Sequence, residues 1–240
     1  MKFITGTKFN RNHVQPHERI MILGRTGTGK SVFADTLMTF LGKRTFIVLF
    51  DPEGVYTHYP ILDIKTLYTQ KKGVFRITEI IYNDNKLLGK DYTIDDPQTI
   101  VEFLAHNLYK RGNCILAIEE LGSVLPKSNT KLIDLSHHVG VLITRGRKQD
   151  VGFIGIAQRT QHIHTEFLSQ ATHIISYEVS SKHDLDAMKA YIDKDKYENL
   201  KRFEFFHYNV RDNYLKHCYR LYGDQLYHSL DYYKALFGQS

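Results

Sequence analysis

The sequence lacks any hydrophobic run that approaches the roughly 18 apolar residues needed to span a bilayer. Its first residues, MKFITG, also lack the apolar core of a secretory signal peptide. The two cysteines, Cys114 and Cys218, show neither paired metal-ligand spacing nor a disulfide framework. We therefore expect a soluble, intracellular protein with reduced thiols and no transmembrane segment.

The sequence also lacks internal repeats, low-complexity tracts, an obvious linker and a concentrated basic tail. Its 240 residues are enough for one α/β domain with its own core. The net charge of +6 agrees with a polyanionic partner such as nucleic acid, although many basic proteins bind none. Any contact with DNA must therefore come from surfaces that the fold assembles.

Short apolar runs that alternate with helical patterns predict an α/β protein. We expect buried strands at residues 20–23, 46–50, 114–118, 153–157 and 173–177. We expect helices at residues 32–41, 98–109, 131–144, 166–169 and 184–192. Residues 74–77 are expected to form an edge strand, and residues 83–96, with their Asn and Asp breakers, a loop. Residues 203–210 and 214–222 alternate and predict a C-terminal hairpin.

The strongest motif is GRTGTGKS at residues 24–31, which fits the phosphate-binding pattern G-x-x-x-x-G-K-[ST] at every fixed position. Glycines let the backbone fold around phosphates, and the amide groups at the helix N-terminus then face the anion. Lys30 is expected to reach the β- and γ-phosphates, and the Ser31 hydroxyl to ligate Mg²⁺. The predicted nucleotide-binding residues are Gly24, Arg25, Thr26, Gly27, Thr28, Gly29, Lys30, Ser31 and Val32.

A second motif, ILAIEE at residues 115–120, is an apolar strand that ends in two carboxylates. Glu119 is expected to hold Mg²⁺, directly or through water, and Glu120 to polarise the attacking water. Aspartate is more common than glutamate at the first of these positions. Two solvated glutamates at a strand end would look the same, and the upstream phosphate-binding motif favours the catalytic interpretation.

Two further features flank the strand expected at residues 153–157. Gln158 follows that strand, and a polar residue there lies beside the nucleotide crevice of an α/β sheet. Arg145 and Arg147 precede it, and either arginine could act in trans as a finger on the nucleotide of a neighbouring subunit. A solvated run of charges and a strand-end glutamine without a role are the alternatives.

Together, the motifs resemble the FtsK–HerA superfamily of DNA-pumping ATPases. The matching segments are GRTGTGKS at 24–31, FIVLFDPEG at 46–54, ILAIEE at 115–120 and RGRKQDVGFIGIAQR at 145–159. The resemblance implies a RecA-like, mainly parallel sheet with another strand between the phosphate-loop strand and the strand that carries Glu119. It also implies hexameric rings around double-stranded DNA.

The resemblance implies a role for each matching residue. Lys30 and Ser31 would bind ATP and Mg²⁺, Glu119 would aid the metal, Glu120 would be the catalytic base and Gln158 the sensor. Arg147 is the first choice for the trans-acting finger and Arg145 the second.

The chain is short for this superfamily and resembles the genome-packaging ATPases of viruses with internal membranes or double-jelly-roll capsids. We therefore expect an ATP-driven DNA translocase that fills a capsid and is recruited by a capsid or membrane-vertex protein. It would work in the host cytoplasm or in association with the virion. The expected organisation is an N-terminal arm at 1–19, an ATPase core at 20–200 and a β-rich appendage of the same domain at 201–240. Residues 121–131 are the candidate pore loop.

Three alternatives remain. A conjugative, plasmid-mobilisation or phage-assembly (Zot-like) ATPase would share the same core. A GTPase would use residues 51–54 as D-x-x-G and 181–184 as a guanine-reading motif, but the former begins only 20 residues after Ser31. A nucleotide-gated scaffold without enzymatic activity would usually have lost one of the residues Lys30, Ser31, Glu119 and Glu120.

Overall fold

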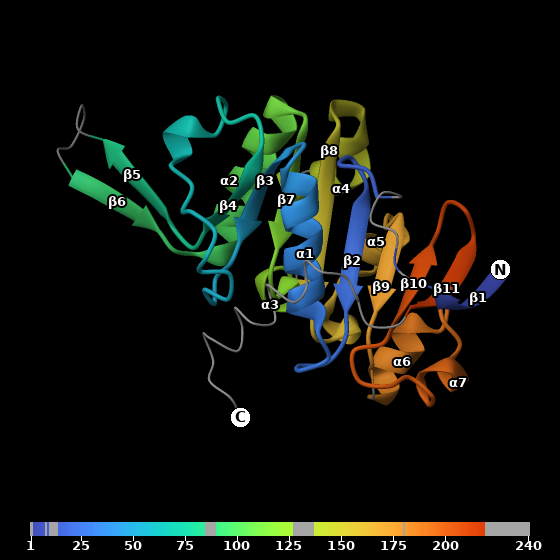
Figure 1. Cartoon of the computed structure of the whole chain (residues 1–240). Coiled ribbons are helices and arrows are strands. Elements are labelled where there is room, and N and C mark those ends of the chain that lie inside the picture. The colour runs from blue at the N-terminus through green and yellow to red at the C-terminus, as the bar shows by residue number, and fades with distance from the viewer. Residues whose placement is uncertain are drawn as a thin grey trace.

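The computed structural model describes residues 2–7, 9, 14–84, 90–126, 137–179 and 181–218. Within these residues, a nine-stranded sheet has the order β1-β11-β10-β9-β2-β8-β7-β3-β4 (Figure 1). Its strands are β1 (Lys2–Thr7), β2 (Arg19–Leu23), β3 (Phe46–Phe50), β4 (Gly73–Ile77), β7 (Cys114–Ile118), β8 (Val151–Ala157), β9 (His173–Ser176), β10 (Phe205–Asn209) and β11 (Tyr214–Cys218).

Six neighbouring strands of this sheet, from β9 to β4, run parallel to one another. β10 is antiparallel to β9 and forms a hairpin with β11, and β1 adds to the edge in parallel with β11. Strand β8 lies between β2 and β7. This order confirms the expected RecA-like sheet, in which one strand separates the phosphate-loop strand from the strand that leads to Glu119.

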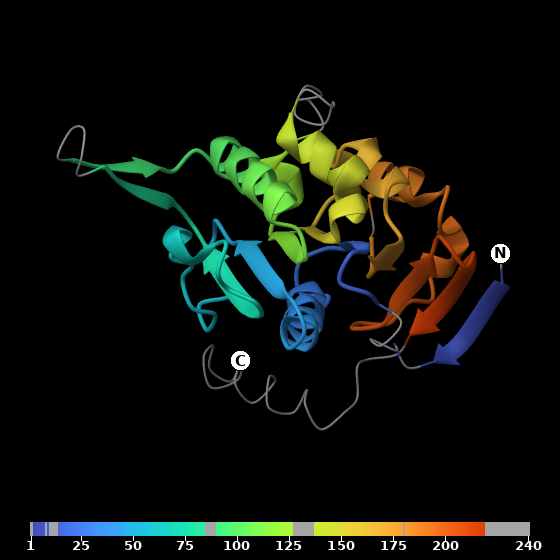
Figure 2. The ribbon, with the colours of Figure 1, turned by 90° about the horizontal axis from the view of Figure 1, so that it is seen from above.

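Helices cover both faces of the sheet. α1 (Lys30–Gly42) lies on one face, whereas α2 (Pro97–Arg111) and α4 (His138–Arg145) lie on the other (Figure 2). Alternate residues of β2 therefore enter two different cores. Ile20 packs with Phe33 of α1, and Met21 packs in the core that contains Leu104 of α2. A strand buried on both faces needs a continuous apolar sequence, as β2 has.

Smaller helices connect the strands. They are α3 (Leu121–Val124), α5 (Thr165–Ser169), α6 (Lys182–Met188), α7 (Lys194–Tyr197) and the 3₁₀ turns η2 (Ile64–Thr66), η4 (Gly146–Gln149) and η5 (Thr160–His162). In the part of the chain that is described, no helix combines the length and the apolar character needed to cross a membrane.

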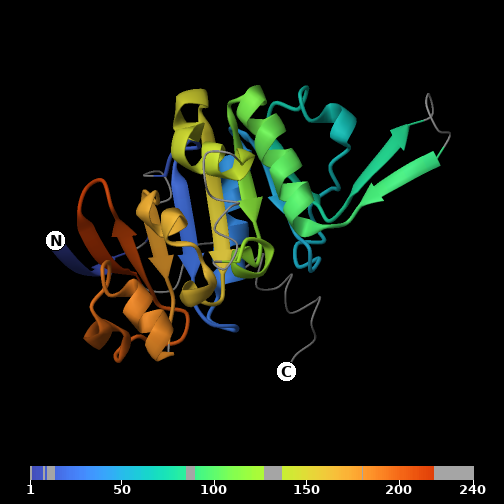
Figure 3. The ribbon, with the colours of Figure 1, turned by 180° about the vertical axis from the view of Figure 1, so that it is seen from behind.

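One expected loop is a pair of strands. The segment expected as a loop at residues 83–96 overlaps β5 (Ile80–Asp84) and contains β6 (Lys90–Ile94). These two strands pair antiparallel and project away from the main sheet (Figures 1 and 3). The prediction of a loop was wrong because Asn and Asp residues mask the alternation of the strands. The pairing partner across the hairpin, rather than local propensity, stabilises them.

Several boundaries also differ from the sequence prediction. β10 begins at Phe205, and Phe203 lies in the preceding turn rather than in the strand. α6 begins at Lys182 and ends at Met188, so the helix expected at 184–192 lies further towards the N-terminus. Parts of three expected segments lie outside the described residues. They are residues 131–136 of the expected helix, residues 219–222 of the expected second hairpin strand and residues 127–131 of the candidate pore loop.

Residues 1–19 contribute to the sheet at two places. Lys2–Thr7 form β1, and Arg19 is the first residue of β2. The division into an arm, a core and a C-terminal appendage stays a prediction.

The buried carboxylate of Asp184 ties α6 to the segment after β8. It accepts hydrogen bonds from Ser181 Oγ at 2.5 Å, from Thr160 Oγ1 at 2.9 Å and from the Gln161 amide at 3.1 Å. Burial alone would raise the pKa of Asp184, but these hydrogen bonds outweigh it and hold the pKa below its usual value.

We expect Asp184→Ala to lower the free energy of unfolding at pH 7 by about 2 kcal/mol, because the buried Thr160 hydroxyl and two partly buried donors lose their acceptor. A lowered pKa stabilises the fold above the unfolded-state value, so the difference should shrink as the pH falls below about 4. Urea unfolding between pH 3 and pH 7 measures it. Asp186→Ala, at an exposed position of the same helix, is the control and should change stability by less than about 0.5 kcal/mol. Equal effects of the two variants would contradict this role.

Candidate nucleotide-binding site

The phosphate-binding loop connects β2 to α1 at the carboxyl ends of the parallel strands. Two backbone hydrogen bonds anchor its first residues: the Gly24 amide donates to Ala157 O at 3.3 Å, and the Arg25 amide to Glu178 O at 3.0 Å. The Arg25 side chain forms an ion pair with Glu178 at 2.9 Å. The ends of β8 and β9 therefore hold the start of the loop in place.

The interior of the loop is arranged around the Arg25 carbonyl. Lys30 Nζ donates to this oxygen at 3.1 Å, and Thr28 Oγ1 donates to it at 2.7 Å. Gly29 is the N-cap of α1 and supplies no side-chain cap, so the first amide groups of the helix are open to an anion. Burial lowers the pKa of Lys30, and the charges of Glu119 and Glu120 oppose that effect.

Glu119 and Glu120 follow β7 at the same edge of the sheet. The Glu119 amide donates to Phe50 O at 3.0 Å, and Tyr56 OH donates to Glu119 Oε2 at 3.0 Å. Burial is the main cause that raises the pKa of Glu119 to about 7, and the neighbouring charge of Glu120 adds to it. A carboxyl group with a pKa of about 7 is protonated in part of the molecules at neutral pH, and a bound cation would favour its ionised form.

A chain of side-chain hydrogen bonds links the phosphate-binding loop to the second carboxylate. Thr26 Oγ1 donates to Gln158 Oε1 at 2.7 Å, and Gln158 Nε2 donates to Glu120 Oε1. Glu120 has a φ of +49°, in the left-handed region that non-glycine residues rarely adopt. Burial raises the pKa of Glu120. The three side chains come from three different connections, which the strand order β2-β8-β7 brings together.

A cavity of about 350 Å³ lies between these groups. Its lining includes nine of the predicted site residues and three residues that the motifs do not mark. The lining residues are Thr26, Gly27, Gly29, Lys30, Ser31, Val32, Glu53, Val55, Glu119, Glu120, Gln158 and Phe203. Gly24, Arg25 and Thr28, which were also predicted, form the frame of the loop behind this surface.

Sequence reasoning missed four contributors to the site. Glu53, Val55 and Phe203 line the cavity, and Tyr56 lies behind it with its hydroxyl on Glu119. The turn after β3 places the first two, because the buried Asp51 carboxylate accepts hydrogen bonds from the amides of Val55 and Tyr56 at 2.9 and 2.8 Å. The only sequence signal for this turn is the Asp-Pro-Glu-Gly run.

The donor set fits Mg²⁺, which prefers hard oxygen ligands. The Ser31 side chain and the Glu119 carboxylate both line the cavity. They therefore supply a hydroxyl and a carboxylate beside the surface where phosphate oxygens would lie.

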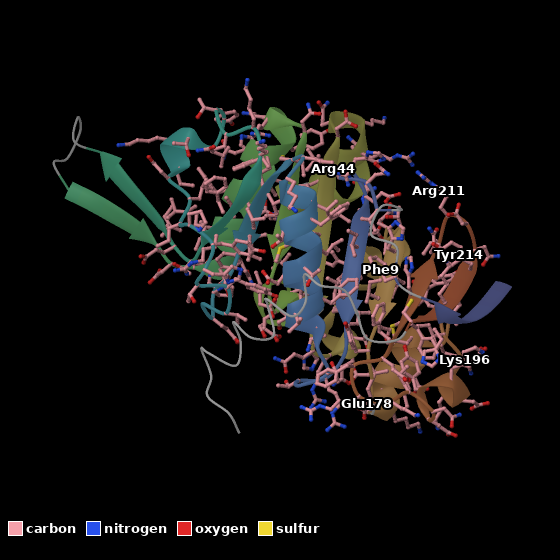
Figure 4. The ribbon with its side chains drawn as sticks, viewed as in Figure 1. Phe9, Arg44, Glu178, Lys196, Arg211 and Tyr214 are labelled. Atoms are coloured by element: carbon pink, nitrogen blue, oxygen red, sulfur yellow. The ribbon has the colours of Figure 1, made fainter. Side chains whose placement is uncertain are left out.

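Arg145 and Arg147 are not brought to this cavity. They lie in and after α4, before the start of β8, whereas Gln158 follows the end of that strand. They line a second cavity of about 490 Å³ together with Arg19, Thr144, Lys148 and Gln170. Figure 4 shows Glu178 at the lower end of the molecule and Arg44 and Arg211 near its upper end.

The second cavity is strongly cationic. Arg145, Arg147 and Lys148 are exposed, whereas Arg19 is buried and donates through Nε to Ile143 O. No carboxylate of the described residues forms an ion pair with these four cations. A buried guanidinium without a counter-charge is costly, so this surface suits an anion. The sequence pattern around β2 did not indicate that Arg19 lines this second cavity.

The geometry disfavours the guanine-reading alternative. Asp184 lies in α6, where Ser181, Thr160 and Gln161 occupy its carboxylate, and it is not part of the cavity lining.

Comparisons with known proteins agree with this geometry. The family model described as "Helicase HerA, central domain" matches residues 14–221. The genome-packaging NTPase B204 of Sulfolobus turreted icosahedral virus 2, solved with ATP-gammaS, is 18% identical with a TM-score of 0.68, over 87% of this chain and 100% of that chain.

Two larger proteins share the fold. The conjugation coupling protein TcpA of pCW3 is 14% identical with a TM-score of 0.56, over 92% of this chain and 67% of that chain. EccC of Thermomonospora curvata is 14% identical with a TM-score of 0.53, over 87% of this chain and 39% of that chain. No protein with a curated description matches the sequence.

Proposed function

The chain belongs to the HerA helicase central-domain family of P-loop ATPases, and we propose that it uses ATP hydrolysis to move double-stranded DNA into a viral capsid. The observation that carries the enzymatic part is the hydrogen-bonded chain from Thr26 through Gln158 to Glu120 across the phosphate-loop cavity. It supports the proposal because a carboxylate and a side-chain amide are hydrogen-bonded to the loop that would hold the phosphates.

Each side chain has a distinct role in the proposed reaction. Lys30 and the amides at the start of α1 bind the β- and γ-phosphates, and Glu120 orients and activates the attacking water. Gln158 senses the γ-phosphate. Loss of that group would change the contacts of Thr26 and Glu120, and both of these side chains are hydrogen-bonded to Gln158. Ser31 and Glu119 would hold Mg²⁺, which when bound would supply positive charge beside the phosphates.

The proposed partners follow from the second cavity and from the resemblance. In a closed hexameric ring, Arg147 of one subunit would reach the nucleotide of the next. Double-stranded DNA would contact the assembled ring through its phosphates, and a capsid or membrane-vertex protein would recruit the motor. The match to the full length of B204 supports the packaging role, because that protein is itself described as a genome-packaging NTPase.

The test is ATP hydrolysis by the full chain with and without double-stranded DNA. We expect DNA to stimulate hydrolysis several-fold, and the stimulation to fall as the salt concentration rises, because phosphate contacts release counterions. Lys30→Ala is the control for contaminating ATPases and should show no activity. Replacing DNA with heparin shows whether any polyanion stimulates hydrolysis, and replacing ATP with GTP tests the nucleotide preference. Hydrolysis that ignores DNA, or a clear preference for GTP, would contradict the translocase proposal.

A further inference from the structure

The strand order places different residues at the two ends of the nucleotide cavity. Glu119, Glu120 and Gln158 enter it from the ends of β7 and β8, which lie on one side of the phosphate-loop strand β2. β9 and β10 lie on the other side of β2, and Phe203 enters the cavity from the turn just before β10. In the proposed function the γ-phosphate lies beside Glu120, so the rest of the nucleotide would extend towards the opposite end, where Phe203 lies.

The turn that carries Phe203 is tightly held. The Glu204 amide donates to Lys201 O at 3.0 Å, and the Lys201 amide donates to Glu204 Oε2 at 3.0 Å. Glu204 is in turn fixed by His217 of β11, whose Nε2 lies 3.0 Å from the same carboxylate oxygen. Phe203 has a φ of +70°, a left-handed conformation in which glycine is usual and a bulky side chain costs energy.

The strained backbone directs the ring of Phe203 at the phosphate-binding loop. A Cβ atom added at Gly29 would lie 3.2 Å from Phe203 Cδ1, and Gly29 itself has a φ of +105°. Of the described residues that line the cavity, Phe203 is the one with an aromatic ring. The Arg202 guanidinium lies over this ring, 4.8 Å from its centroid. Strain of this kind persists where the surrounding structure enforces it, and it often marks a ligand contact.

We propose that Phe203 is the platform on which the purine base of the bound nucleotide stacks. The proposal rests on the proposed binding of ATP in this cavity and adds a specific contact for the base. Stacking of a base on an aromatic ring tolerates different bases, because every base has a π face. Phe203 therefore contributes affinity for the nucleoside part, whereas Lys30 and the loop amides contribute affinity for the phosphates.

The experiment compares the affinities for ATP and for inorganic tripolyphosphate, measured by calorimetry on the full chain. Phe203→Gly keeps the left-handed turn and removes the ring, so the melting temperature should change by only about 3 °C. We expect it to weaken ATP binding about tenfold and to change tripolyphosphate binding less than about twofold. Phe203→Trp should retain the affinity of the wild type for ATP.

Asn213→Gly is the matched control, because Asn213 also has a left-handed backbone, with a φ of +47°, in the turn between β10 and β11. It should leave both affinities unchanged. An unchanged affinity of Phe203→Gly for ATP, or an equal loss for ATP and tripolyphosphate, overturns the role of Phe203. If the wild type binds and hydrolyses ATP in that case, the proposed function survives. A wild type that binds neither ligand overturns both.

Discussion

Arg147→Ala is expected to lower steady-state ATP hydrolysis about 1000-fold and to leave ATP affinity unchanged. The reason is the distance between the two cavities: Arg147 precedes β8 and Gln158 follows it, so seven strand residues separate them within one chain. At about 3.3 Å per residue, the strand spans roughly 20 Å. Arg147 can therefore act on a nucleotide only when a second subunit presents one.

Mixing two inactive variants tests this arrangement directly. Glu120→Gln subunits lack the proposed base but keep Arg147, whereas Arg147→Ala subunits keep the base and lack the finger. We expect the mixture to regain part of the wild-type rate at interfaces where an intact Glu120 meets an intact Arg147. Arg145→Ala in the same assay ranks the two arginines. A mixture as inactive as its components, with assembly shown by light scattering, would contradict a trans-acting role.

Gly152→Ala is expected to lower the free energy of unfolding by about 3 kcal/mol or more. Gly152 lies in the central strand β8, and a Cβ atom there would meet the backbone oxygen of Pro16 at 1.9 Å and that of Glu18 at 3.0 Å. Backbone atoms cannot rotate away as a side chain can. The segment before β2 would have to move, together with the hydrogen bond from the Phe153 amide to Glu18 O.

Gly155→Ala is the matched control in the same strand. A Cβ atom there would meet the ends of three side chains, among them Leu121 Cδ2 at 2.8 Å and Met21 Sδ at 2.9 Å. Side-chain ends can shift at a smaller cost, so we expect a loss of about 1–2 kcal/mol. Urea unfolding of both variants gives the comparison. If Gly152→Ala lowers the free energy of unfolding no more than Gly155→Ala does, the backbone of residues 16–18 can move aside at little cost, and the prediction is wrong.

The parallel centre of the sheet could be predicted because its strands are continuous apolar runs. β3 and β7 begin and end at the predicted residues. Local sequence did not predict the β5–β6 hairpin, because cross-strand pairing decides its structure. It also did not predict β1, whose partner β11 is more than 200 residues away along the chain.

The residues of the nucleotide site also fall into those that the sequence predicted and those that it did not. Short motifs predicted that Lys30, Ser31, Glu119, Glu120 and Gln158 belong to the site, because each proposed role needs a particular side chain at a strand or helix end. Phe203 and Tyr56 have no such pattern. Their places depend on a left-handed turn and on a buried hydroxyl that meets Glu119, and both are products of tertiary packing.

The position of β2 in the sheet also sets the order in which the protein can fold during synthesis. Both hydrogen-bonded neighbours of β2 come much later in the chain: β8 begins at Val151, and β9 begins at His173. A ribosome that adds about 10 residues per second needs on the order of ten seconds to make the roughly 130 residues between the end of β2 at Leu23 and the start of β8 at Val151. The apolar strand before the phosphate-binding loop therefore stays unpaired until most of the chain has emerged. The phosphate-binding loop is therefore made before β8 and β9, and it acquires these supporting strands only after they have been synthesised.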